Sequence, residues 1–158
     1  MSGRLRSELK QGKDFESLEV EAFLNLQLTA DLLMRGVAEL LKTADLSPTQ
    51  YNVLRILKGA GSDGLPCSEI AERMVTKDPD ITRLLDRMEE RGWVIRTRDG
   101  KDRRVVMGRI TPAGSKLAAQ MEQPLLELHR QQLAPLGKSG LRTLVEQLEL
   151  IRESMSES

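Results

Sequence analysis

The sequence concentrates basic side chains in one short segment, and basic side chains are the groups that bind phosphate. Between residues 91 and 109 there are seven lysines and arginines against two aspartates, an excess of five positive charges. The chain as a whole is neutral, with 24 basic and 24 acidic residues, so the excess is local. A neutral protein with one cationic segment is compatible with a localised contact to nucleic-acid phosphates.

The cationic residues surround Asp99-Gly100, a pair that favours a two-residue hairpin turn between strands at 93–98 and 104–110. Guanidinium groups at the tip of such a narrow projection suit the negative potential of a narrow minor groove. Solubilising turns show the same pattern, so the hairpin alone leaves both interpretations open. The residues assigned to DNA contact here are Arg96, Arg98, Lys101, Arg103 and Arg104.

A second candidate surface precedes the hairpin. We expect a short helix with Asp78 as its N-cap, Pro79 at its first position and Gly92 as its stop. Its inward face is Ile81, Leu84, Leu85 and Met88. The outward face can reach phosphates or base edges, and the residues assigned to this contact are Lys77, Pro79, Asp80, Thr82, Arg83 and Arg87.

The acidic residues of this face favour the other interpretation, an ordinary solvated helix surface. A carboxylate near DNA either accepts from a cytosine amine or weakens binding by repulsion. We interpret Asp80 as a cytosine contact.

These surfaces need a particular set of elements to position them. Helices at 48–58 and 68–75 precede the helix at 79–91 and the hairpin, and three helices followed by a hairpin is the order of a winged helix. Residues 68–92 supply the helix-turn-helix. We therefore predict a mainly α fold with a small β-hairpin wing.

The flanking segments show a different pattern. Apolar residues recur at steps of three and four from Phe23 onward and again over 141–155, which marks long amphipathic helices. Between them, Thr111 caps a helix at 112–133 in which Pro124 predicts a kink or a break. Paired apolar rows favour an intertwined dimer, although an intramolecular core explains them too. The predicted dimerisation residues are Phe23, Leu26, Leu141, Leu144, Leu148 and Ile151.

The domain organisation follows from these elements. We expect a flexible N-terminal arm at 1–17, a helical dimerisation region at 18–45 and 112–158, and a winged helix-turn-helix domain at 46–111. The sequence contains no apolar run that would span a membrane and no signal peptide, which indicates a cytoplasmic protein.

The sequence offers little for catalysis. Cys67 is the single cysteine and His129 the single histidine, which excludes an internal disulfide and a clustered Cys/His metal site. There is no nucleophile motif and no phosphate-binding loop. We therefore expect neither an enzyme nor a cofactor.

Three runs of the sequence carry a family resemblance: LSPTQYNVLRIL, SEIAERM and DITRLLDRMEERGWVIRTRDGKDRRVVMGRITPAG. Their order and spacing resemble the MarR (multiple antibiotic resistance regulator) family over roughly residues 25–155. The resemblance implies a triangular homodimer that places two winged-helix lobes in successive major grooves of DNA. It also implies a transcriptional repressor that occludes its operator and is released by a small aromatic or phenolic effector.

The resemblance also assigns roles to individual residues. It implies that Thr82 and Arg83 contact DNA from the recognition helix, and that Asp102 holds the wing in shape while Arg104 or its neighbour enters the minor groove. Pro79 and Asp80 replace the small hydroxyl residues that commonly open the family's recognition helix, so its base preference does not transfer.

Two alternatives remain at this point. Cys67 near a helix N-terminus could have a lowered thiol pKa and sense oxidants, or it could be inert buried filler. A winged helix can also serve only as a protein-interaction module. The salt dependence of binding separates such a module from a DNA-binding protein.

Overall fold

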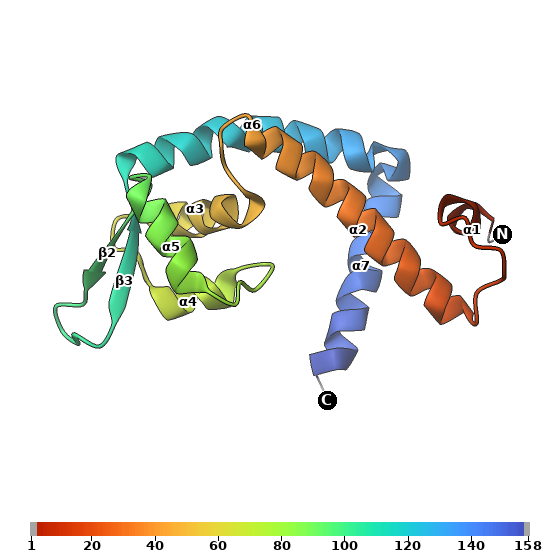
Figure 1. Ribbon diagram of the computed structural model, residues 1–158, viewed down its shortest axis with the longest axis horizontal. Helices are drawn as coiled ribbons and strands as arrows, with labels where there is room; N and C mark the ends of the chain where they lie inside the picture. The colour runs from red at the N-terminus through yellow and green to blue at the C-terminus, as the bar shows by residue number, and fades with distance from the viewer. Residues whose placement is uncertain (1–2, 157–158) are drawn as a thin grey trace.

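The computed structural model describes residues 3–156; residues 1–2 of the expected arm and 157–158 of the expected dimerisation region lie outside that range. In chain order the elements are α1 (Arg4–Glu8), α2 (Leu18–Lys42), α3 (Pro48–Ala60), β1 (Leu65–Pro66), α4 (Cys67–Arg73), α5 (Ile81–Glu90), β2 (Val94–Arg98), β3 (Val106–Ile110), α6 (Pro112–Leu133), a 3-10 turn η1 (Ala134–Leu136) and α7 (Gly137–Ser156). Figure 1 shows α3 to β3 gathered in one lobe, with α6 crossing above it and α2 and α7 leading away.

The predicted fold class is confirmed. The lobe contains three helices followed by a β-hairpin, and the fold is mainly α. The sequence did not reveal β1, which is only two residues long and pairs with β3 on the side opposite β2, giving the antiparallel order β1-β3-β2. A strand this short leaves no alternating pattern to detect.

The hairpin turn is longer than predicted. The strands end at Arg98 and resume at Val106, so residues 99–105 form a seven-residue loop where two residues were expected. The Asp99 N–H donates to the Val105 carbonyl at 2.9 Å, and the Val105 N–H donates to the Asp102 carbonyl at 3.1 Å. The second bond forms an inner turn at 102–105, so the Asp-Gly pair is not the point where the chain reverses.

Side-chain caps set the starts of the longer helices. Ser17 caps α2, which therefore begins five residues before Phe23, where the apolar pattern becomes clear. Ser47 and Gln50 form a reciprocal capping box at α3. The predicted cap of α6 by Thr111 is confirmed, because its hydroxyl accepts from the Gly114 N–H at 3.0 Å.

Of the kink or break expected at Pro124, the break does not occur, because α6 continues through this residue as one helix. Near its far end α6 approaches α2 closely, because the Gln132 side-chain amide donates to the Leu33 carbonyl at 3.1 Å. A Cβ on Gly36 would lie only 2.6 Å from that amide nitrogen, so glycine permits the approach.

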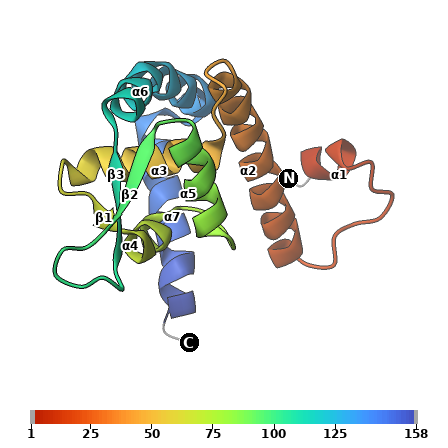
Figure 2. The same cartoon turned by 60° about the vertical axis from the view of Figure 1, so that its left-hand side comes forward.

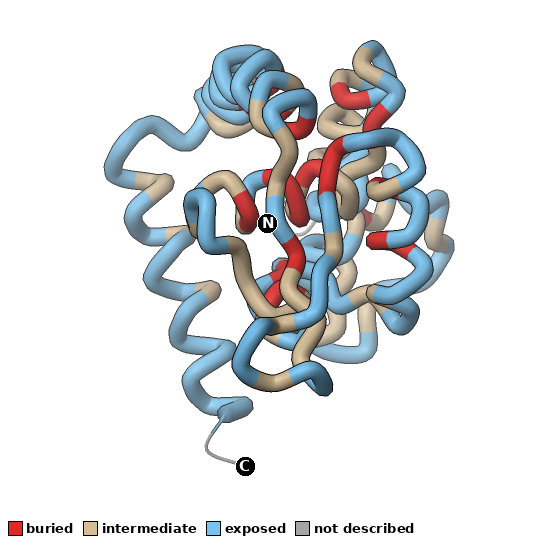
Figure 3. Tube along the Cα trace, turned by 90° about the vertical axis from the view of Figure 1, so that its left-hand side faces the viewer, coloured by how far each residue is buried: buried red, intermediate tan, exposed pale blue. Residues whose placement is uncertain are grey.

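The hydrophobic core lies in the lobe and extends into the long helices. Its fully buried side chains include Val53, Leu54 and Leu57 of α3, and Leu85 and Met88 of α5. The same cluster takes in one residue near the end of α2 and three on α6; these are Leu41, Ala118, Met121 and Leu125. The tube in Figure 3 is red mainly within the lobe, whereas the helix that ends at the C-terminus is pale blue and tan.

The N-terminal segment contains a structured element. The helix α1 buries Leu5, and the Arg6 guanidinium bonds the Gly12 carbonyl and the Asp14 carboxylate at 2.8 and 2.6 Å. Among residues 3–156, no helix is both long and apolar enough to cross a membrane.

Candidate nucleic-acid interface

The helix α5 begins two residues later than predicted, and Asp80 rather than Asp78 is its N-cap. The Asp80 carboxylate accepts from the Arg83 N–H at 3.0 Å. Asp78 instead accepts from the Asp80 N–H at 2.8 Å, which closes a local turn around Pro79. Pro79 therefore lies before the helix, so the predicted cap and first position were wrong.

The two faces of α5 are as the apolar spacing predicted. Leu84, Leu85 and Met88 are buried and Ile81 is half-buried, which leaves the opposite face exposed. The exposed residues include Thr82, Arg83 and Arg87. Neither arginine is paired with a carboxylate within residues 3–156.

Arg96 does not project from the wing. Its side chain is only 19% exposed, and its guanidinium bonds Glu89 at 2.9 Å and also Asp86, both on α5. The Arg96 backbone N–H donates to Glu89 as well, at 3.0 Å. This backbone bond, followed by the bond from the guanidinium, lowers the pKa of Glu89. Arg96 therefore joins the wing to α5.

The alternation of β2 carried a signal for this role. Val94 is buried and Ile95 is exposed, so Arg96 shares the inward side of the strand with Val94. Arg96 was assigned to DNA contact from the local excess of positive charge, without regard to this alternation.

The remaining cations of the wing lie at its tip. Arg98, Lys101 and Arg103 are exposed and have no carboxylate partner in the described part of the chain. The Arg98 guanidinium donates to the Arg103 carbonyl at 3.0 Å and so spans the loop. Figure 1 shows the wing loop at the lower left of the lobe and the turn before α5 on its right-hand side, toward α2. Figure 2 shows the wing loop extending beyond the sheet.

Asp102 lies inside the wing loop, where it bonds Arg104. Its carboxylate accepts from the Arg104 backbone N–H at 3.0 Å and from the guanidinium at 3.2 Å. These bonds lower the pKa of Asp102, the side-chain bond contributing most. The Arg104 side chain is 91% exposed, so it can leave Asp102 for another anion.

Lys77 lies in the turn between α4 and α5. Its ammonium bonds the carbonyls of Ala71, at 3.3 Å, and Glu72. Free carbonyls at the end of a helix attract cations, so Lys77 stabilises the end of α4 in this structure. It remains exposed.

The terminal helices leave apolar side chains uncovered. The helix α7 has no buried residue; Leu141, Leu144 and Leu148 are half-buried, and Ile151 is 51% exposed. On α2, Phe23 and Leu26 are 62% and 45% exposed. The apolar rows of α2 and α7 therefore do not form a buried core within this single chain.

Cys67 differs from a reactive thiol. It is half-buried at the start of α4, and burial raises the pKa of its thiol, which outweighs the opposing effect of Arg96. The lowered pKa considered from the sequence is wrong, because burial disfavours the charged thiolate at this helix start. Within residues 3–156 no group of His, Cys, Asp and Glu is arranged to hold a metal ion.

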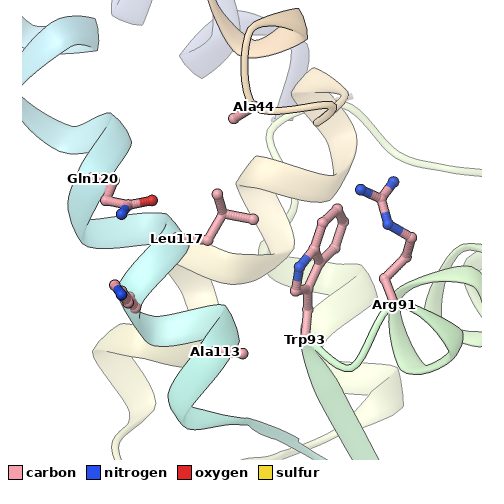
Figure 4. A pocket seen from close by; sticks show the side chains of 7 residues that line it. Ala44, Arg91, Trp93, Ala113, Leu117 and Gln120 are labelled. Atoms are coloured by element: carbon pink, nitrogen blue, oxygen red, sulfur yellow. The ribbon is translucent and has the colours of Figure 1, made fainter.

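An open depression of about 360 Å³ lies where the lobe meets α6 (Figure 4). Trp93 and Leu117 form its apolar wall, and Lys116 lies at its edge. The Arg91 guanidinium stacks on Trp93, 4.2 Å from the ring centre, and pairs with Asp45 at 3.1 Å. Arg91 thus connects the end of α5 to the linker between α2 and α3, a role that no pattern in the sequence indicates.

Comparison with known proteins gives a consistent result. The model of the MarR family matches residues 46–106. The repressor MdtR of Bacillus subtilis is 35% identical over 102 residues, which are 65% of this chain and 64% of MdtR.

Solved structures of MarR proteins resemble this chain in fold. The crystal structure of a MarR transcription factor from Planctomyces limnophilus is 40% identical, covers 87% of this chain and 99% of its own, and has a TM-score of 0.67. A mutant of E. coli MarR complexed with operator DNA shares the fold with a TM-score of 0.78 at 23% identity, over 88% of this chain and 99% of that one.

Proposed function

Because the chain belongs to the MarR family of transcriptional regulators, we propose that it binds a pseudo-palindromic operator as a homodimer and represses transcription by occluding it. The protein is a DNA-binding regulator and not an enzyme. A winged helix that contacts only other proteins is not favoured, since relatives of the same fold include one complexed with operator DNA.

The observation that carries this proposal is the presence of unpaired cations on both projections of the lobe. Arg83 and Arg87 on α5, with Lys101 and Arg103 on the wing, have no carboxylate partners within residues 3–156, and all are exposed. An exposed cation without a partner is free to displace counterions from DNA phosphates. We assign α5 to the major groove and the wing tip to the minor groove.

The other predicted contacts are assigned by what their side chains already bind. Thr82 and Arg83 on α5 can reach base edges and phosphates. Asp80 uses one oxygen to cap α5, and we assign the other to a cytosine amine. Pro79 lies in the preceding turn and contacts DNA through its ring. Arg96 is engaged by α5, so we leave it out of the interface.

The uncovered apolar rows of α2 and α7 support the homodimer. A second copy would cover Phe23, Leu26 and the α7 row together. Burying apolar surface stabilises association by about 25 cal/mol per Å² before the costs of ordering. A dimer with two-fold symmetry can place two α5 helices about 34 Å apart, one turn of DNA.

We place the small aromatic or phenolic effector in the depression beside Trp93. An acidic group on the effector would compete with Asp45 for Arg91 while its ring packs on Leu117. This exchange would loosen the lobe from α2, and a coupling of about 1 to 3 kcal/mol is enough to switch operator affinity. If no aromatic acid or phenol altered operator affinity, the regulator would instead act constitutively.

Selecting bound sequences from random duplex DNA tests the central proposal. We expect enrichment of a site with two-fold symmetry and half-sites about one turn apart. The affinity for this site should fall steeply as salt rises, and Arg104→Ala should weaken binding and reduce the salt slope by about one.

Arg130→Ala is the matched control, because Arg130 is an exposed arginine on α6 that the interface does not include. It should leave both quantities unchanged. No enriched sequence, or binding that does not depend on salt, would contradict the proposal.

A further inference from the structure

The turn between α4 and α5 exposes an apolar side chain a few residues before the start of α5. Val75 is 86% exposed, the largest value among the exposed large hydrophobic residues of the described chain. The others lie on α2, α6, η1 or α7, or at the C-cap of α1, where a partner chain can cover them; Ile95 on β2 is the other exception. Val75 therefore needs a separate explanation.

The turn holds Val75 outward through internal hydrogen bonds. The Val75 backbone N–H donates to the Asn52 side chain of α3 at 2.9 Å. Lys77 bonds the last carbonyls of α4, Asp78 bonds the Asp80 N–H, and Asp80 caps α5. A turn fixed at so many points loses little conformational entropy when it contacts a ligand.

The charge of the turn determines which part of DNA it can contact. Residues 74–80 contain one lysine and two aspartates, so the turn carries a net negative charge, which the phosphate backbone repels. The polar side chains named above are engaged within the protein. Besides the exposed Thr76, the turn offers the aliphatic side chain of Val75. The apolar group on the floor of the major groove is the 5-methyl group of thymine.

We propose that Val75 contacts the 5-methyl group of a thymine in each half-site and so contributes to sequence specificity. This inference rests on the proposed function, because α5 must enter the major groove to bring the turn to the bases. Val75 acts beside α5 and adds a preference that the exposed face of α5 does not supply.

The test removes only the methyl groups from the DNA. The duplex enriched from random DNA is synthesised with each thymine in turn replaced by deoxyuridine, in both half-sites together. The full-length protein should lose affinity at one such position, about fourfold per half-site, the value expected for burying one methyl group. Val75→Ala should bind the thymine and deoxyuridine duplexes equally, and as weakly as the wild type binds the deoxyuridine duplex.

Two further variants sharpen the test. Val75→Thr keeps the shape of the side chain and one of its two methyl groups, so it should keep part of the methyl preference, between the wild type and Val75→Ala. Ile95→Thr also replaces an apolar side chain with threonine, at the other exposed large hydrophobic residue of the lobe, and should keep the preference.

The outcomes are distinct. Failure to enrich any sequence would contradict the proposed function itself. A selected site without a methyl-dependent position, or a dependence that Val75→Ala retains, would overturn the role of Val75 while leaving DNA binding intact. Loss of the dimer in Val75→Ala would also overturn it, because the side chain would then belong to an interface between subunits.

Discussion

Arg96 shows how one buried contact can reassign a basic residue. Charge alone assigned it to DNA, whereas the alternation of β2 places it inward, against Asp86 and Glu89. Arg104 belongs to the same cationic segment, and its side chain is 91% exposed. The composition of a cationic segment therefore predicts an interface, and the contacts that each side chain makes within the protein determine which members can reach it.

Replacing Arg96 with methionine should lower the free energy of unfolding by about 1 to 3 kcal/mol, because hydrogen bonds to charged groups are lost. Chemical denaturation at neutral pH measures this loss. The salt slope of DNA binding should not change, since Arg96 contacts no phosphate. If Arg96→Met reduced the salt slope of DNA binding and left the free energy of unfolding unchanged, Arg96 would belong to the DNA interface after all.

The pKa of Glu89 adds a pH dependence to this prediction. Its pKa is lowered in the folded protein, so its contribution is present above the ordinary glutamate value near 4.3 and is lost as pH falls through the folded value. The stability difference between wild type and Arg96→Met should therefore shrink when unfolding is measured below about pH 4.

The α5 helix and the wing act as one element because strand β2 is bound to α5 by side chains. Glu89 also occupies the Arg96 N–H at the open edge of the sheet, where an unpaired donor could recruit another strand. The sequence predicted the helix and both strands but not this link. It predicted the wrong cap for α5, because two aspartates flank Pro79 and local preference does not choose between them.

The helix α7 is amphipathic but buries nothing in its own chain, which is why the sequence could predict its apolar row but not its partner. If the proposed dimer forms through this row, Leu148→Asp should convert it into monomers, because a carboxylate would replace an apolar side chain at the proposed subunit interface. Light scattering measures the mass. Glu149→Gln on the neighbouring exposed position should stay dimeric. A dimeric Leu148→Asp protein would argue against this interface.

Polar contacts of Arg91 join the lobe to the linker that follows α2. Arg91 bonds both the carbonyl and the carboxylate of Asp45, at 3.2 and 3.1 Å, and stacks on Trp93. Asp45 has a positive φ of 55°, which is uncommon for a residue other than glycine. The contact spans 46 positions in the sequence, and no local pattern encodes such a pairing.

Replacing Arg91 with alanine should free the lobe to vary its orientation and weaken operator binding several-fold, with a cost in stability of about 1 kcal/mol. Arg91→Lys keeps the charge but not the stacked, two-pronged geometry and should recover only part of the affinity. Fluorescence anisotropy with labelled operator measures both variants. Full affinity in Arg91→Ala would show that the lobe orientation is set elsewhere.

The shared core has a consequence for how such regulators can diversify. Leu41 and three residues of α6 pack with α3, α5 and Trp93 in one hydrophobic cluster. Excising residues 46–111 would therefore divide this core, and the DNA-binding lobe would not separate intact from the long helices. Grafting a new DNA specificity by exchanging that segment alone would set mismatched surfaces against each other. A working chimaera should exchange residues 41–125 as a block, or change only the solvent-facing positions of α5 and the wing.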